Sequence, residues 1–119
     1  MQGLGDLESI VMDVLWQATD SRSVRDVLTE LVPERHLAYT TVMTVLDNLH
    51  RKGWVSRQRH GRAYLYRPTA TREEAAARVL RDLLASTGDP AGVLLHFARS
   101  ASDGESAVLR RGLQERTDE

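Results

Sequence analysis

Short hydroxyl side chains gather on one side of the segment 39–52. Thr40 and Thr44 lie four residues apart, so they share one face of a helix, and Thr41 lies next to them. A threonine hydroxyl can bond to phosphate or to a base edge, while its methyl group can contact the methyl group of thymine. Because these side chains are short, the backbone of such a helix can approach a groove closely. The pattern predicts a helix that enters the major groove of DNA.

The same threonines also allow a simpler interpretation, in which Thr40 and Thr41 are ordinary capping residues of a solvated helix. Three neighbouring features favour the groove: a helix with its own N-cap precedes this one, a basic hairpin follows it, and the hydroxyls share one face. The residues expected to contact DNA from this helix are Tyr39, Thr40, Thr41, Met43, Thr44, Arg51 and Lys52.

Positive charge is concentrated after this helix, although the whole chain has a net charge of only −1. No acidic residue occurs between Asn48 and Arg72. A basic surface on a nearly neutral protein predicts a localised contact with a polyanion. The basic residues of this stretch are Arg51, Lys52, Arg57, Arg59, Arg62, Arg67 and Arg72.

Two short segments rich in aromatic and β-branched residues, 54–59 and 63–67, predict the strands of a β-hairpin. Between them Gly61 can adopt the positive φ that a tight turn needs, and Pro68 closes the second strand. A hairpin placed here is expected to act as a wing that lies along the phosphate backbone or enters the minor groove. Its expected contact residues are Arg59, His60 and Arg62.

Asp47 is the exception on the predicted groove face, because phosphate repels a carboxylate. It lies four residues before Arg51, which is the spacing and order of a helical ion pair, so Arg51 is expected to neutralise it. The alternative is that Asp47 accepts a hydrogen bond from the amino group of a cytosine.

Three helices must position these residues. Apolar side chains recur at helical spacing from Leu7 to Gln17, after Ser23, and again in the segment 39–52. Ser23 has the form of an N-cap, and Gly53 is placed to end the third helix. Three helices followed by a hairpin are typical of a winged helix-turn-helix.

The C-terminal part predicts three further helices. Start signals stand at Thr71, at Asp89-Pro90 and at Ser102, and the polar tail after Leu113 is expected to fray.

This C-terminal part is too small to build a core alone, since Phe97 is its only aromatic residue. We therefore expect it to pack against a second copy of the chain. The predicted architecture is mainly α with a small β-hairpin: a winged helix-turn-helix domain over residues 1–70, followed by a helical dimerisation domain over residues 71–119.

Catalysis and metal binding have little support in the sequence. The chain contains no cysteine, which excludes disulfides, thiol catalysis and thiolate metal sites. Its histidines show no zinc-ligand spacing, and there is no phosphate-binding glycine loop and no nucleophile elbow. No apolar run is long enough to cross a bilayer, and no signal-peptide pattern occurs. We expect a cytosolic, soluble protein without enzyme activity, metal or cofactor.

Several strings of the chain resemble the BlaI/MecI family of penicillinase repressors. They are LAYTTVMTVL at 37–46, GRAYLYRP at 61–68, LGDLE at 4–8 and VMDVLW at 11–16. The resemblance covers nearly the whole chain and implies a winged-helix domain, a helical dimerisation domain and inverted-repeat operators, typically with TACA/TGTA-type half-sites. It also implies roles in base contact for Thr40, Thr41 and Thr44 with Met43 beside them, and in the wing for Arg59 and Arg62.

Members of this family repress β-lactamase or related genes, and they are released when a membrane-bound sensor triggers their proteolysis. The resemblance places the release site at His96-Phe97, where staphylococcal members have an Asn-Phe pair, so the asparagine is absent here. Phe97 also has a structural interpretation, as the main apolar anchor of the dimer interface.

We therefore predict a homodimeric transcriptional repressor of a β-lactamase or related stress-response gene set, with double-stranded operator DNA as its partner. One alternative is a winged-helix protein-interaction module whose basic wing binds an acidic partner protein. Another is a ligand-sensing regulator with a pocket between its domains, for which the C-terminal part is small.

Overall fold

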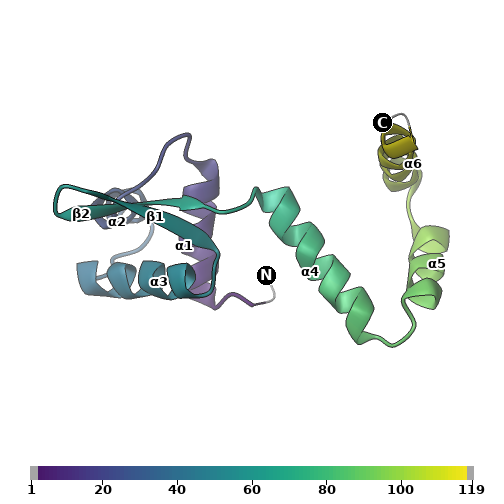
Figure 1. Cartoon of the computed structure of the whole chain (residues 1–119), viewed down its shortest axis with the longest axis horizontal. Coiled ribbons are helices and arrows are strands. Elements are labelled where there is room, and N and C mark those ends of the chain that lie inside the picture. The colour runs from purple at the N-terminus through teal and green to yellow at the C-terminus, as the bar shows by residue number, and fades with distance from the viewer. Residues whose placement is uncertain (1–2, 118–119) are drawn as a thin grey trace. The chain divides into compact units, whose positions relative to one another are not determined.

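The computed structural model describes residues 3–117 and divides the chain into two units, Met1–Val79 and Leu80–Glu119, which we describe separately (Figure 1). The helix α4 (Arg72–Ser86) runs across the boundary between them. The other elements of the first unit are α1 (Asp6–Gln17), α2 (Val24–Leu31), α3 (Tyr39–Arg51), β1 (Val55–His60) and β2 (Ala63–Pro68). The second unit contains α5 (Pro90–Ser100) and α6 (Asp103–Thr117).

The first unit has a closed hydrophobic core. Each of its first three helices turns its predicted apolar stripe toward this core, although Leu7, Ile10, Val14 and Leu28 are only partly buried. The base of the hairpin adds two more side chains. Removing this apolar surface from water is the main force that holds the three helices and the hairpin together. The core residues are Val11, Met12, Leu15, Val24, Val27, Leu31, Val42, Val45, Leu46, Leu49, Val55 and Tyr66.

The helix boundaries follow the capping signals. Ser23 Oγ accepts a hydrogen bond from the Asp26 backbone N–H at 3.1 Å, and the Asp26 carboxylate accepts one from the Ser23 N–H at 3.0 Å. Equivalent reciprocal pairs start α4 at Thr71 and α6 at Ser102. Gly53, with a φ of 84°, follows the end of α3. The predicted starts of these helices are thus confirmed.

The hairpin pairs β1 and β2 in antiparallel register, with His60 opposite Ala63. Its turn is therefore the two residues Gly61 and Arg62, and His60 belongs to the strand rather than to the turn as predicted. Gly61 has a φ of 64°, which fits the tight connection. The hairpin also gains a bridge that the sequence does not reveal, because Arg22 and Tyr66 exchange backbone hydrogen bonds of 2.9 and 2.8 Å.

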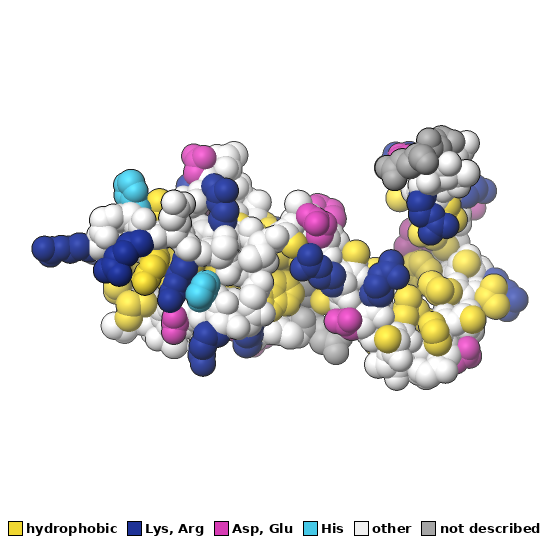
Figure 2. Space-filling model, viewed as in Figure 1, with side chains coloured by type: hydrophobic (Ala, Val, Ile, Leu, Met, Phe, Trp, Pro, Cys, Tyr) yellow, Lys and Arg dark blue, Asp and Glu magenta, His cyan; other side chains and the backbone are white. Residues whose placement is uncertain are grey.

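The second unit differs from the first because neither α5 nor α6 buries any residue. Figure 2 shows apolar side chains gathered on the surface of α5. The prediction that the chain frays after Leu113 is wrong for residues 114–117, since α6 continues to Thr117, and the last two residues of that tail lie outside the described residues. The Thr117 hydroxyl donates to the Leu113 carbonyl at 3.1 Å, and Arg111 and Glu115 form an ion pair of 3.7 Å along the same helix. The large exposed apolar side chains of α4 to α6 are Leu80, Leu83, Val93, Leu94, Leu95, Phe97, Val108, Leu109 and Leu113.

Candidate nucleic-acid interface

One face of α3 is open to solvent and carries the predicted contact residues. Thr40, Met43 and Thr44 are exposed, whereas Thr41 is half-buried at the edge of this face. The Thr44 hydroxyl donates to the Thr40 carbonyl at 2.9 Å. Because this bond uses the hydroxyl hydrogen, the Thr44 side chain offers a ligand an acceptor oxygen and a methyl group.

The N-terminal end of α3 is also open. Its N-cap is Ala38, whose side chain makes no capping bond, so the first N–H groups of the helix have no side-chain acceptor. Tyr39 is 44% exposed, and the Arg25 guanidinium lies 5.8 Å from the centre of its ring. This contact ties α2 to the start of α3. Free N–H groups at a helix N-terminus can bind an anion such as phosphate.

The two basic residues at the C-terminal end of α3 have partners inside the protein. Arg51 is hydrogen-bonded to the side-chain oxygen of Asn48. Lys52 donates to Glu8 Oε1 at 2.8 Å, which links the end of α3 to the first turn of α1. Both side chains are exposed enough to meet solvent, and their contact with DNA stays a prediction.

Glu8 is the buried charged residue that the sequence does not single out. Its carboxylate also accepts a hydrogen bond from the Gly5 N–H at 2.7 Å, and only 8% of the residue is exposed. Burial pushes the pKa of Glu8 up, but the bonds from Gly5 and Lys52 together outweigh it and leave the pKa below its ordinary value. Glu8 therefore holds α1 to α3 as a carboxylate.

Replacing Glu8 with alanine should lower the free energy of unfolding at pH 7 by about 1–3 kcal/mol, because the Gly5 N–H and the Lys52 ammonium lose their acceptor. Since the folded pKa is depressed, this contribution is complete above the unfolded value of about 4.3 and is lost as the pH falls through the folded pKa. Urea unfolding followed by circular dichroism from pH 7 to pH 3 measures the effect. Curves for Glu8→Ala and wild type that stay equally far apart at every pH would contradict it, and Glu34→Ala, at an exposed position, is the control.

The tip of the hairpin carries the predicted wing residues Arg59, His60 and Arg62, all of them exposed. Figure 2 shows Lys and Arg side chains projecting from this end of the hairpin. The Arg59 guanidinium lies 5.6 Å from the centre of the Tyr64 ring, so stacking orients it. Among the described residues Arg62 forms no ion pair and is open to an outside anion.

Asp47 is neutralised by the wing and not by its own helix, so the predicted Asp47–Arg51 pair is wrong. Arg57 Nη1 lies 3.1 Å from Asp47 Oδ1, and the Arg57 guanidinium covers the Tyr64 ring at 4.2 Å. Hydrogen bonding to the Tyr66 hydroxyl, and then to Asp47, raises the pKa of Arg57 above its ordinary value. Helical spacing identifies possible partners only within one helix. The partner of Asp47 instead comes from β1, which packs against α3 and brings Arg57 next to the carboxylate.

Sequence reasoning counted Arg57 among the basic residues of the acid-free stretch but missed its contact with Asp47. A usable signal lies in strand alternation, because Val55, Arg57 and Arg59 share one face of β1. Val55 is buried, so the same face of the strand points toward the fold at its base. Arg57 is two residues further along, where that face meets α3.

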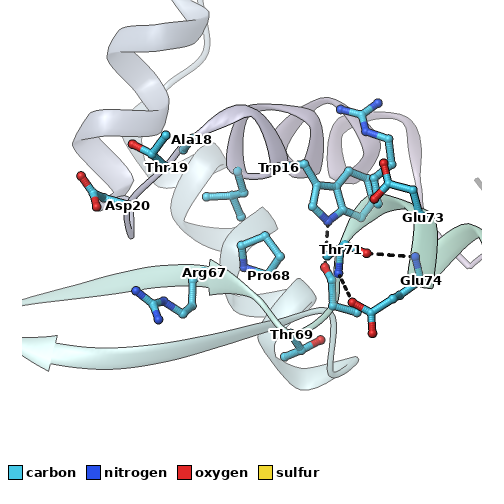
Figure 3. A pocket seen from close by; sticks show the side chains of 13 residues that line it. Trp16, Ala18, Thr19, Asp20, Arg67, Pro68, Thr69, Thr71, Glu73 and Glu74 are labelled. Atoms are coloured by element: carbon cyan, nitrogen blue, oxygen red, sulfur yellow. Dashed lines mark hydrogen bonds between the residues drawn. The ribbon is translucent and has the colours of Figure 1, made fainter. Parts of the chain in front are cut away.

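A pocket of about 590 Å³ opens beside the end of α1, the end of β2 and the start of α4, all within the first unit (Figure 3). Trp16 closes one side, and its indole N–H donates to the Ala70 carbonyl at 3.1 Å. The Thr71–Glu74 capping pair forms another side, and Asp20, Arg67 and Arg72 contribute charged groups to the lining. The alternative of a ligand-sensing regulator stays a prediction.

His96 and Phe97 lie in the middle of α5, and both are exposed. Phe97 is 51% exposed although it is the largest apolar side chain of the second unit. Within residues 3–117 there is no cluster of acidic and histidine side chains that could hold a metal, and no helix is long and apolar enough to cross a membrane.

Comparison with known proteins gives this arrangement a context. The family model described as the penicillinase repressor matches residues 4–115. The chain is 44% identical over 115 residues to the transcriptional regulator BlaI of Mycobacterium tuberculosis strain CDC 1551 / Oshkosh, and the match covers 94% of this chain and 83% of that protein. The protein of the same name from strain ATCC 25618 / H37Rv matches equally well.

Solved structures agree on the fold. The solution structure of the DNA-binding domain of the repressor BlaI matches with a TM-score of 0.53 and 28% identity, over 59% of this chain and 84% of that domain. The PcaV transcriptional regulator of Streptomyces coelicolor matches with a TM-score of 0.51 and 22% identity, over 98% and 77% of the two chains, which shows a shared fold alone.

The predicted winged helix-turn-helix is therefore confirmed, and residues 3–117 form six helices and one antiparallel hairpin. The family model spans residues of both units, and the curated relatives that match the chain are transcriptional regulators. The chain belongs to the penicillinase repressor family of transcriptional regulators.

Proposed function

We propose that the chain is a homodimeric transcriptional repressor that places α3 of each subunit in the major groove of one half of an inverted-repeat operator. The observation that carries the proposal is the open face of α3, where Thr40, Met43 and Thr44 are exposed beside the basic tip of the hairpin. A short, mixed polar and apolar face of this kind suits the acceptors, amino groups and methyl groups of the groove.

The contact residues divide into two groups. Thr40, Thr41, Met43 and Thr44 face base edges and carry sequence preference, whereas the wing residues Arg59, His60 and Arg62 bind phosphate and set the register. Tyr39 and the open N–H groups of α3 add phosphate contacts at the start of the helix.

Residues 71–119 supply the dimer interface in this proposal. The support is the second unit itself, in which α5 and α6 leave Leu94, Phe97 and Leu109 about half exposed. Large apolar patches of this kind are rare on monomers and mark interaction surfaces. A two-fold dimer matches the symmetry of an inverted repeat, with the two readers about one turn of DNA apart.

We infer the regulatory setting as part of this function. The chain would act in the cytoplasm as a repressor of β-lactamase or related stress-response genes, with a role in antibiotic resistance. The similarity to the transcriptional regulator BlaI of M. tuberculosis supports the regulatory role. Release through a membrane-bound sensor and proteolysis at His96-Phe97 belongs to the same proposal. That peptide bond lies within α5, so the helix must open locally before a protease can cut there.

Binding to a duplex that carries inverted TACA/TGTA half-sites should be tight and strongly dependent on salt. If each subunit neutralises about four phosphates, the affinity should fall by about four decades between 50 and 200 mM KCl. Fluorescence anisotropy with this duplex and with a random duplex of equal length measures the affinity and its dependence on salt. Failure to bind either duplex at low salt contradicts the proposal and favours a wing that binds an acidic protein.

A further inference from the structure

The ion pair between Asp47 of α3 and Arg57 of β1 is not used by the proposed contacts with DNA. We infer that Asp47 and Arg57 are positioning residues that fix the wing relative to α3 before DNA binds, and that Arg57 does not contact phosphate. The inference rests on the proposed function, because it concerns how the same surface is presented to DNA.

The geometry engages the Arg57 guanidinium with both α3 and the second strand of its own hairpin. It donates to the Asp47 carboxylate at 3.1 Å and covers the Tyr64 ring at 4.2 Å, and its side chain is 25% exposed. Arg62 at the tip has no ion pair among the described residues and is exposed. The two arginines of one hairpin are therefore placed for different tasks.

The charge pattern leaves Arg57 no other acidic neighbour in this part of the sequence. Asp47 is the only acidic residue between Arg35 and Arg72, and it is the only one in α3. An unpaired carboxylate on this face would repel phosphate, whereas a paired one is close to neutral there. The benefit of the pair therefore lies in geometry and not in attraction for DNA.

The contact also extends toward the tip. Arg59 lies opposite Tyr64 in the hairpin register, and its guanidinium is 5.6 Å from the centre of the Tyr64 ring. Arg57 contacts the same ring at the shorter distance of 4.2 Å. Asp47, Arg57, Tyr64 and Arg59 thus form a continuous row from α3 to the wing tip. Fixing this row in the free protein reduces the ordering cost of binding, which is the usual benefit of preorganisation.

The test compares Asp47→Ala, Arg57→Ala, their double variant and Arg62→Ala in the full-length dimer, titrated at several KCl concentrations against the inverted TACA/TGTA duplex. We expect Asp47→Ala and Arg57→Ala each to weaken binding about 5- to 10-fold with an unchanged salt slope, and the double variant to be no weaker than the weaker single one. Arg62→Ala should lower the slope by about 1.8, because one phosphate contact is lost in each subunit.

Tighter binding by Asp47→Ala would overturn the inference, since it would mean that the carboxylate only repels phosphate. A salt slope for Arg57→Ala that falls as for Arg62→Ala, or an affinity equal to wild type, would overturn it as well. Asp47 is about half exposed, so Asp47→Ala carries the test alone if Arg57→Ala does not fold. Failure of the wild type to bind the duplex counts against the proposed function instead, which separates the two outcomes.

Discussion

Replacing Thr44 with glutamate should strongly weaken the proposed operator binding while the protein stays folded and keeps the proposed dimer. Thr44 is exposed on the face of α3 proposed to enter the groove, and its hydroxyl bonds only within the helix. Glutamate adds bulk and negative charge at the groove in both subunits. Since each lost base contact costs about 1–3 kcal/mol, the two together should reduce affinity about 30-fold or more.

The fold should tolerate this change, because glutamate is a better helix former than threonine and no buried group loses a partner. Anisotropy titration gives the affinity, and circular dichroism with analytical ultracentrifugation gives the fold and the dimer. Thr19→Glu is the matched control, with the same change of charge at an exposed bend between α1 and α2. Binding by Thr44→Glu within twofold of wild type, or an equal loss in Thr19→Glu, would rule out a groove contact at this position.

Replacing Phe97 with glutamate should convert the proposed dimer into a monomer. Phe97 is the largest apolar side chain of the second unit and is 51% exposed in the single chain. A carboxylate at the centre of an apolar interface loses its hydration without gaining a partner, so association becomes unfavourable. Because a monomer engages one half-site at a time, operator affinity should also fall about 100-fold or more.

His96→Glu is the matched control for the dimer, since it introduces the same charge one residue earlier on α5 at an exposed polar position. It should sediment as the wild type does. A dimeric Phe97→Glu variant would show that the interface lies elsewhere. A monomeric variant with full operator affinity would show that operator binding does not require two subunits. Either result can be obtained without knowing the regulated genes.

The first unit could be predicted from the sequence almost completely, because its elements are specified by local signals. The apolar stripes of the first three helices face the core as their spacing predicts, and the capping pairs at Ser23 and Thr71 form. The exposed face of α3 follows from the same periodicity, since burial of Val42 and Leu46 leaves Thr40 and Thr44 outside. Local patterns therefore predict most of the fold of the first unit and the exposed face of α3.

Contacts between different elements could not be predicted from the sequence. Two ion pairs, Glu8–Lys52 and Asp47–Arg57, each join residues on different elements. Spacing within one helix predicts neither pair. For Asp47 the spacing even selected the wrong arginine, because Arg51 is bonded to Asn48 instead. Which side chain reaches a charge depends on how the hairpin packs against α3, and that is set by the whole core.

The absence of buried side chains in α5 and α6 has a consequence for how a dimeric repressor would respond to its own abundance. The first unit, with its closed core, should melt at the same temperature at every dilution, whereas order in the second unit would rise with protein concentration. At low abundance, occupancy of an inverted repeat would then grow with the square of the amount of chain. A given drop in synthesis would then lower promoter occupancy more steeply than it would for a repressor that binds as a preformed dimer.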